Sequence, residues 1–242
     1  MQSEVSDIIS AIIEQGAHEF NIELPPEAVA AFRAYYDFLE KRGQHVNLTA
    51  ISGAKDVARL HFLDSLALLK AETFANTRVI DIGSGAGFPG VPLKIAEPSI
   101  DLTLLDATGK RITFLSELCT ELGITATCLH ARAEDAAHKV EMREKYDIAV
   151  SRAVSQLSIL CELCLPFVKF GGTFIAMKSV ESDDEISEAS NVITTLGAEL
   201  TQCVDYTIYE TDITHRAVLI RKTGETPDKY PRRFAKIKSA PL

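Results

Sequence analysis

The stretch that decides the fold is VIDIGSGAGFPGVP, residues 79–92. Val79–Ile82 is a short apolar run typical of a buried strand, and it leads into a glycine-rich turn. Glycines let the chain turn sharply and let a ligand approach the backbone where a Cβ would otherwise intrude. Proline is tolerated in a loop or in a first helical turn, so Pro89 and Pro92 place the next helix start near Val91.

Strands and helices alternate from residue 77 onward. The predicted strands are 77–82, 101–105, 125–130, 146–151 and 172–177, and the predicted helices are 89–97, 108–122, 132–144, 155–166 and 183–197. Such alternation predicts a parallel sheet with right-handed crossovers. Two further runs, 199–209 and 213–222, have no helix between them and predict an antiparallel hairpin. We therefore expect an α/β fold with a mostly parallel seven-stranded sheet.

The residues before the sheet carry helical periodicity. Helices are predicted for 3–20, 26–42 and 54–70, with Gly43 placed to end the second. The chain is accordingly divided into an N-terminal helical segment (1–72), an α/β domain (73–224) and a C-terminal tail (225–242).

Composition limits the class of protein. The chain has 242 residues, 46% of them hydrophobic, which suffices for a large core. No apolar run is long enough to cross a membrane, and the N-terminus is acidic where a signal peptide would be basic. The five cysteines lie in apolar stretches, so we expect reduced thiols and no metal site. A monomeric cytoplasmic protein is the expectation.

The glycine-rich turn fits two ligand-binding patterns. Gly85-x-Gly87-x-x-Gly90 matches the dinucleotide fingerprint, in which a pyrophosphate sits at the helix N-terminus. Asp81-x-Gly83-x-Gly85-x-Gly87 matches the loop of Rossmann-like methyltransferases. The second register is preferred because a carboxylate at Asp81 would repel a pyrophosphate but favours the cationic methionine end of S-adenosylmethionine.

Two later positions add to this pattern. Asp106 ends the second strand, 23 positions after Gly83, where a carboxylate accepts hydrogen bonds from ribose hydroxyls. Ala133 and Glu134 follow the third strand, beside the expected position of an adenine. Asp106 and Glu134 also have purely structural interpretations. Asp106 could cap the next helix, and Glu134 could be an exposed residue in the first turn of a helix.

The charge distribution points to a second ligand. The net charge is -9, yet Lys229–Lys238 contains five basic residues and two aromatic residues without an acid. Basic side chains bind phosphate and aromatic rings stack on exposed bases. We expect RNA contacts from a set of tail residues: Lys229, Tyr230, Arg232, Arg233, Phe234, Lys236 and Lys238.

Taken together, these motifs resemble the 16S ribosomal RNA guanine-N7 methyltransferase family (RsmG, also called GidB). The resemblance covers nearly the whole chain: Asn47–Ile51, His61–Ser65, Asp81–Pro92, Asp106 with Lys110-Arg111, Arg132–Glu134, Ser151–Ala153 and Tyr230–Arg233. It implies a Rossmann-like class I methyltransferase fold and S-adenosylmethionine as cofactor, with contacts at Gly83, Phe88, Ala133, Glu134 and Arg152. The end of the tail, after Arg233, departs from the glycine-containing form of many members.

The implied reaction is methylation of N7 of one guanosine in 16S ribosomal RNA, on the small ribosomal subunit or its assembly intermediate. Guanine N7 carries a lone pair and no proton, so transfer needs no general base and depends on positioning. Arg152 and Lys178 follow strands four and five, at the edge where ligands bind. Arg152 is expected to border the pocket and Lys178 to hold RNA phosphate. His61 and Asp64, one helical turn apart, are expected to pack rather than catalyse.

Three alternatives remain open at this point. The chain could methylate a small molecule or a protein, it could be a nicotinamide-dependent oxidoreductase that uses the Gly85–Gly90 register, or it could be a ribosome-assembly factor without turnover. RNase sensitivity of the activity and a direct test of cofactor binding would discriminate among them.

Overall fold

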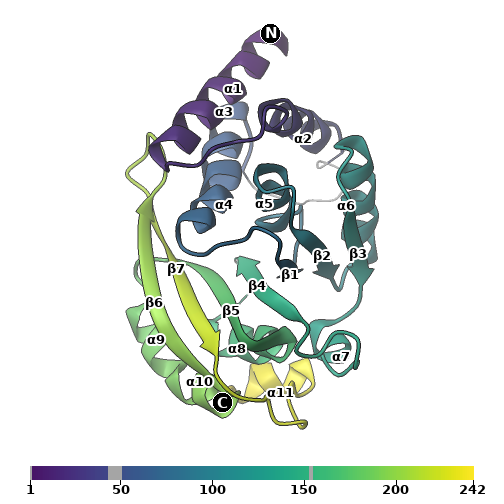
Figure 1. Ribbon diagram of the computed structural model, residues 1–242, viewed down its shortest axis with the longest axis vertical. Coiled ribbons are helices and arrows are strands. Elements are labelled where there is room, and N and C mark those ends of the chain that lie inside the picture. The colour runs from purple at the N-terminus through teal and green to yellow at the C-terminus, as the bar shows by residue number, and fades with distance from the viewer. Residues whose placement is uncertain (1, 43–50, 153–154) are drawn as a thin grey trace.

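Seven strands form one sheet in the computed structural model, which describes residues 2–42, 51–152 and 155–242 (Figure 1). The strand order is β3-β2-β1-β4-β5-β7-β6. The strands are β1 Arg78–Ile82, β2 Asp101–Asp106, β3 Ala126–His130, β4 Tyr146–Arg152, β5 Val168–Ser179, β6 Ala198–Thr207 and β7 Thr214–Lys222. Strands β1 to β5 are parallel, whereas β7 is antiparallel to both β5 and β6. The predicted sheet and hairpin are confirmed.

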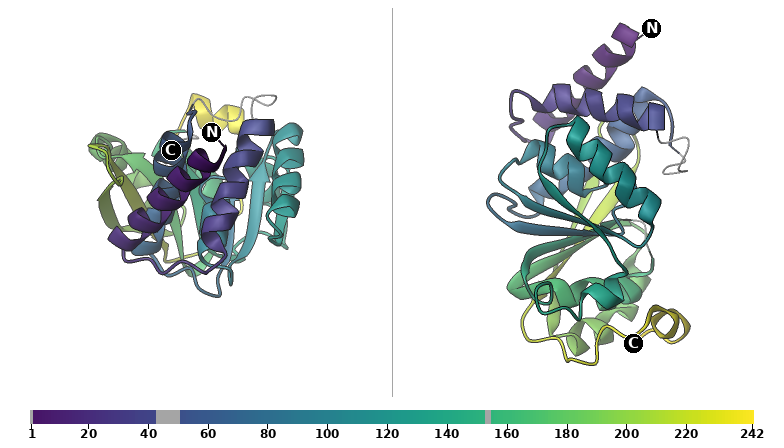
Figure 2. Two further views of the ribbon diagram at one scale, coloured as in Figure 1. Left: turned by 90° about the horizontal axis from the view of Figure 1, so that it is seen from above. Right: turned by 90° about the vertical axis from the view of Figure 1, so that its right-hand side faces the viewer.

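Helices cover both faces of the sheet, as the two views of Figure 2 show. Side chains alternate along a strand, so Val79 and Ile80 point into different hydrophobic clusters. The Val79 cluster includes α1 Gln2–Glu19, α2 Ala28–Arg42, α5 Gly90–Ala96 and α6 Gly109–Glu121; the Ile80 cluster includes α7 Ala133–Ala136, α8 Leu157–Cys164, α10 Ser190–Thr195 and α11 Phe234–Ser239. Both faces are therefore buried, as parallel sheets require.

The predicted helix 54–70 is present but irregular. It comprises α3 Ala54–Val57, a π-helical turn η2 Ala58–Leu63, α4 Asp64–Leu66 and a 3-10 turn η3 Ala67–Lys70. Such π-turns occur mostly as local insertions in α-helices, often at functional sites. Its apolar side packs into the Val79 cluster, which brings His61 and Asp64 to the sheet. The division at residue 72 stays a prediction, and Asn47–Ala50 lie outside the described residues.

Several predicted boundaries are wrong. The helix predicted for 132–144 ends at Ala136, because the following turns contact the tail: the His138 ring lies 2.9 Å from the Pro231 carbonyl oxygen. The helix predicted for 183–197 is split into α9 Asp183–Glu188 and α10. Strand β5 begins at Val168 rather than 172, since Val168 pairs with Tyr146 across an irregularity in the ladder. Helix α11 was not predicted.

The cysteines and the helix lengths can be read from the fold. All five cysteines are free, and Cys161 and Cys164 are fully buried in α8. Within the described ranges, no helix is both long enough and apolar enough to cross a lipid bilayer.

Candidate active site

A pocket of about 820 Å³ opens at the edge where the parallel strands end. Its walls come from the glycine-rich turn after β1, the end of β2, the ends of β4 and β5, the first residues of β7 and the 54–70 helix. The lining residues are Ile51, Leu60, His61, Asp64, Gly83, Ser84, Gly85, Ala86, Phe88, Asp106, Ala107, Thr108, Arg111, Arg152, Met177, Lys178, Ser179 and His215.

The glycine-rich turn is held by the backbone of β2. The N–H groups of Gly83 and Ser84 donate to the Leu105 carbonyl oxygen, at 2.8 and 3.2 Å. Gly83 and Gly85 have φ values of 75° and 59°, in the left-handed region that favours glycine. A Cβ on Gly87 would lie 2.6 Å from the Tyr35 hydroxyl. Gly83 and Gly85 thus form the pocket wall, whereas Gly87 serves close packing behind it.

Asp81 lies behind the turn and does not line the pocket. Its side chain is fully buried, and Oδ2 accepts a hydrogen bond from the Gly90 N–H at 2.9 Å. Burial raises the pKa of Asp81 to about 7, although the Gly90 hydrogen bond opposes that shift. Asp81 thus ties the end of β1 to the start of α5, and its expected role toward the cationic methionine end of a cofactor, directly or through water, stays a prediction.

Asp106 reaches the pocket from the end of β2. Only 3% of the residue is exposed, and its carboxylate accepts hydrogen bonds from the N–H groups of Gly85 (3.1 Å) and Thr108 (2.8 Å). The Arg111 guanidinium lies 3.3 Å from Oδ2. A carboxylate has about four acceptor positions. Asp106 is therefore oriented by the protein and retains capacity for a hydroxyl donor in the pocket.

Arg152 ends β4 and forms an ion pair with Asp64 of the N-terminal helical segment, Nη1 to Oδ2 at 3.0 Å. The other carboxylate oxygen of Asp64 accepts from the Tyr206 hydroxyl at 2.9 Å and from His215 Nδ1 at 2.8 Å. Burial favours protonation of Asp64, but the hydrogen bond from His215 and the charge of Arg152 outweigh it and hold the pKa below its usual value. Asp64 is therefore an ionised acceptor for three side chains.

Aromatic rings form the wall beside Arg152. The rings of His61 and Phe88 stack with centroids 4.4 Å apart, and the Arg152 guanidinium carbon lies 4.8 Å from the centroid of Phe88. Burial, reinforced by the charge of Arg152, lowers the pKa of His61 to about 3. His61 is thus neutral, and its Nδ1 lies 3.0 Å from Nη2 of Arg152, which always donates. Phe88 is only 5% exposed but lines the pocket.

Ala133, Glu134 and Lys178 were predicted to contact the cofactor or the RNA, and the structure places them as follows. Ala133 and Glu134 begin α7, after β3, and neither lines the pocket. Lys178 does line it, but its Nζ is 2.6 Å from Glu185 Oε1 and 2.7 Å from the Ser155 carbonyl oxygen.

The tail corrects two of the RNA-binding expectations. Tyr230 is 6% exposed, so its ring is not available to stack on a base. Arg232 forms an ion pair with Glu162 of α8, Nη2 to Oε2 at 2.6 Å, and Glu162 is fully buried. These residues anchor the tail. Lys229, Arg233, Lys236 and Lys238 are exposed, and Phe234 is partly buried.

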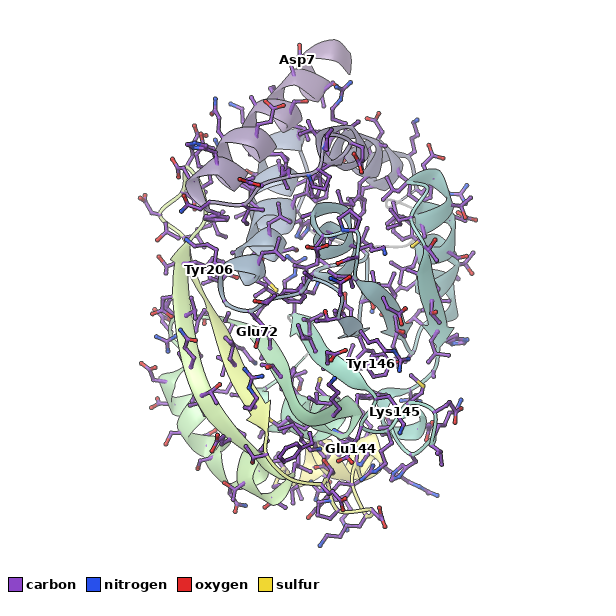
Figure 3. All side chains as sticks on the ribbon, viewed as in Figure 1. Asp7, Glu72, Glu144, Lys145, Tyr146 and Tyr206 are labelled. Atoms are coloured by element: carbon purple, nitrogen blue, oxygen red, sulfur yellow. The ribbon has the colours of Figure 1, made fainter. Side chains whose placement is uncertain are left out.

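Sequence reasoning missed three contributors. Tyr35 of α2 donates to the Ala86 carbonyl oxygen at 2.6 Å, and Tyr206 and His215 complete the shell of Asp64. No local motif marks them, because each meets the site through contacts across 51 to 151 positions of the chain. Figure 3 shows Tyr206 where β6 passes beside α4.

Comparison with known proteins identifies relatives over nearly the whole chain. Residues 28–213 match the family described as GidB, rRNA small subunit methyltransferase G. A protein named ribosomal RNA small subunit methyltransferase G from Alkaliphilus oremlandii is 45% identical over 233 residues, 96% of this chain and 98% of that one. One of the same name from Clostridium botulinum (strain Loch Maree / Type A3) is 41% identical over the same shares.

Solved structures show the same fold at low identity. A methyltransferase from Pyrococcus furiosus superposes with a TM-score of 0.52 at 10% identity, over 66% of this chain and 81% of that one. A structure described under conversion of a disulfide bond into a thioacetal group during echinomycin biosynthesis gives 0.53 at 13% identity, over 68% and 86%. Together with the match to the family and the near full-length relatives, the fold and the pocket establish that this chain belongs to the GidB family of small-subunit rRNA methyltransferases.

Proposed function

We propose that this chain transfers the methyl group of S-adenosylmethionine to N7 of a guanosine in 16S ribosomal RNA. The observation that carries the proposal is family membership together with a pocket of about 820 Å³ at the carboxyl edge of the sheet. That volume lies within the range of about 300–1,000 Å³ typical of small-molecule sites. A pocket at this edge is where α/β sheets bind their ligands.

The donor set of the pocket fits the cofactor. Asp106 would accept the ribose hydroxyls, because its carboxylate is oriented by Gly85 and Thr108 and lines the pocket. The turn at Gly83–Ala86 would hold the methionine portion, since positive φ at Gly83 and Gly85 leaves the backbone open to a ligand. Ala133 and Glu134 follow β3, the neighbour of β2 in the sheet, and would lie toward the adenine. When bound, S-adenosylmethionine supplies an electrophilic methyl group.

The residues around the substrate end of the pocket suit transfer to N7. The proton-free nitrogen needs no base, and His61 is held neutral by burial. The base becomes cationic on methylation, and the Asp64 carboxylate offsets the charge of Arg152 at 3.0 Å. Arg152 would therefore shape and border the pocket without repelling the product. Alignment of N7 with the methyl group would supply the rate, on the order of 7–11 kcal/mol from proximity and orientation.

The RNA would be held by exposed basic groups of the tail. Lys229, Arg233, Lys236 and Lys238 are the exposed cations of the tail, here called the basic tail. Figure 2 shows α11 on the side of the molecule where the parallel strands end. Lys178 would exchange Glu185 for an RNA phosphate. The protein would act as a cytoplasmic monomer on the small subunit or its assembly intermediate.

The proposal is tested with tritiated S-adenosylmethionine and small subunits from cells lacking the enzyme. The labelled RNA is digested and its modified nucleosides are separated. Label in 7-methylguanosine supports the proposal, whereas label in any other nucleoside, or none, contradicts it. RNase treatment of the substrate before the reaction must abolish labelling.

A further inference from the structure

His215 lies at the part of the pocket farthest from Asp106. Strand β7 is antiparallel to β5, so its first residues lie at the edge where the parallel strands end, and His215 pairs with Ser179. The strand order β2-β1-β4-β5-β7 places four spacings between β2 and β7, roughly 19 Å. With the cofactor over β2 and β1, as proposed above, His215 faces the space left for the substrate.

Asp64 fixes the orientation and tautomer of the His215 ring. Its Oδ1 lies 2.8 Å from His215 Nδ1, and its Oδ2 is paired with Arg152. Because the buried carboxylate is ionised and can only accept, Nδ1 of His215 must carry the hydrogen. Tyr206, the cross-strand partner of His215, donates to the same oxygen at 2.9 Å. Asp64 and Tyr206 thus fix the position of the ring, and neither of them forms a hydrogen bond with Nε2.

In the neutral ring, Nε2 is therefore an acceptor. The His215 side chain is 32% exposed and lines the pocket, and no described residue forms a hydrogen bond with Nε2. We propose that Nε2 of His215 accepts a hydrogen bond from N1–H, on the Watson–Crick edge of the target base, and so selects guanine over adenine. This inference rests on the proposed function and adds to it the residue that reads the base.

Guanine and adenine differ at the atoms that such an acceptor would contact. At position 1 and on C2, guanine presents N1–H and a 2-amino group, whereas adenine presents an unprotonated N1, whose lone pair would face that of Nε2, and a C–H. The Watson–Crick donor of adenine is its 6-amino group, at the position where guanine has the O6 acceptor. The methylated atom, N7, belongs to the other edge of the purine, so both contacts can be made at once. Enzymes that act on an extruded base commonly read its Watson–Crick edge in this way. A site built to accept the N–H at position 1 also rejects a base that has an unprotonated nitrogen there.

Two substitutions separate the two ring nitrogens. In His215→Asn, the amide nitrogen takes the place of Nδ1, so the hydrogen bond to Asp64 is retained and the acceptor at Nε2 is lost. In His215→Gln, the amide oxygen takes the place of Nε2, so an acceptor is retained and the bond to Asp64 is lost. Thermal unfolding and S-adenosylmethionine affinity are measured for both variants, and His215→Asn is expected to match wild type in both.

The substrates are small subunits that carry either guanosine or adenosine at the target position. Adenosine subunits are added as competitors while labelled methylation of guanosine subunits is measured. The inhibition that they cause in the wild-type enzyme gives its preference for guanine. We expect His215→Asn to reduce that preference and kcat/KM by about tenfold, the effect of one neutral hydrogen bond of about 1.4 kcal/mol. His215→Gln is expected to retain part of the preference. An unchanged preference in His215→Asn overturns the inference.

Failure of the inference is distinguishable from failure of the proposed function. The nucleoside made by the wild-type enzyme is identified in the same reactions. If 7-methylguanosine forms and His215→Asn keeps the wild-type preference, only the role of His215 is refuted. If the wild type makes a different nucleoside, the proposed function fails and the inference that rests on it fails with it.

Discussion

The Asp64 carboxylate, from the N-terminal helical segment, lies 3.0 Å from the Arg152 guanidinium at the end of β4. Asp64 is 1% exposed, and the Arg152 side chain is 15% exposed. A buried ion pair of this kind is a weak source of net stability, but loss of one partner leaves the other charge uncompensated. This pair therefore makes the helical segment part of the pocket wall.

Arg152→Ala is expected to lower stability and activity together. Removing the guanidinium takes away the charge that compensates the buried Asp64, which keeps only its hydrogen bonds from Tyr206 and His215, so the cost is up to about 3–5 kcal/mol. Urea unfolding measures the loss, and kcat/KM on small subunits measures activity. The double variant Arg152→Ala/Asp64→Asn should recover part of the stability but not the activity. Wild-type kcat/KM in Arg152→Ala would refute the pocket role of Arg152.

The lowered pKa of His61 is expected to reduce the free energy of unfolding in acid. Burial lowers its folded pKa to about 3, while its unfolded pKa is about 6.5. The unfolded chain therefore binds a proton that the folded chain rejects, so stability is lost as pH falls from about 6.5 toward 3. Between pH 7 and 4.5 the loss is roughly 2–3 kcal/mol. Unfolding of His61→Gln in urea across this range should show a correspondingly shallower pH dependence, and an equal slope would contradict the shift.

Asp106→Ala is expected to weaken cofactor binding by roughly tenfold to hundredfold, since hydrogen bonds to a charged group contribute about 1.5–3 kcal/mol. Calorimetric titration with S-adenosylhomocysteine measures the affinity without turnover. Asp101→Ala is the matched control, because that carboxylate begins the same strand at its opposite end and is exposed. Equal affinities in the two variants would remove Asp106 from the site.

The basic tail should determine the salt dependence of RNA binding. Lys236→Ala/Lys238→Ala is expected to reduce the slope of log Kd against log salt by roughly 1.4–1.8, if both lysines contact phosphate. Lys145→Ala/Lys169→Ala is the control, since these exposed lysines lie where β4 and β5 begin, at the opposite edge. The two double variants remove equal charge, so equal slopes would count against the tail.

Arg232 is expected to act through stability rather than through RNA. Arg232→Ala leaves the buried Glu162 carboxylate unpaired, with an expected loss of about 3–5 kcal/mol. Adding Glu162→Gln should restore part of this loss in thermal unfolding. A stable Arg232→Ala variant with a reduced salt slope would instead return Arg232 to the RNA-binding set. Deletion of the whole tail is a poorer test, because it removes this anchor together with the cations.

The sequence by itself determined the sheet and the place of the pocket. The apolar run Val79–Ile82, the glycines after it and the acid at Asp106 are local patterns, and strand periodicity places them at one edge of a parallel sheet. The alternation of strands and helices could be predicted for the same reason: each element carries its own periodicity. Boundaries such as Ala136 could not, because contacts between the 137–145 turns and the tail end that helix.

Only the tertiary structure decided which side chains share the pocket. Asp64 and Arg152 are 88 positions apart, and His215 meets Asp64 across 151 positions. Tyr230 and Arg232 looked like nucleic-acid contacts in the sequence, yet packing against the sheet and an ion pair with Glu162 occupy them. The type of a residue limits which partners its side chain can bind. Burial and long-range contacts decide which partner it does bind, and the local sequence does not encode them.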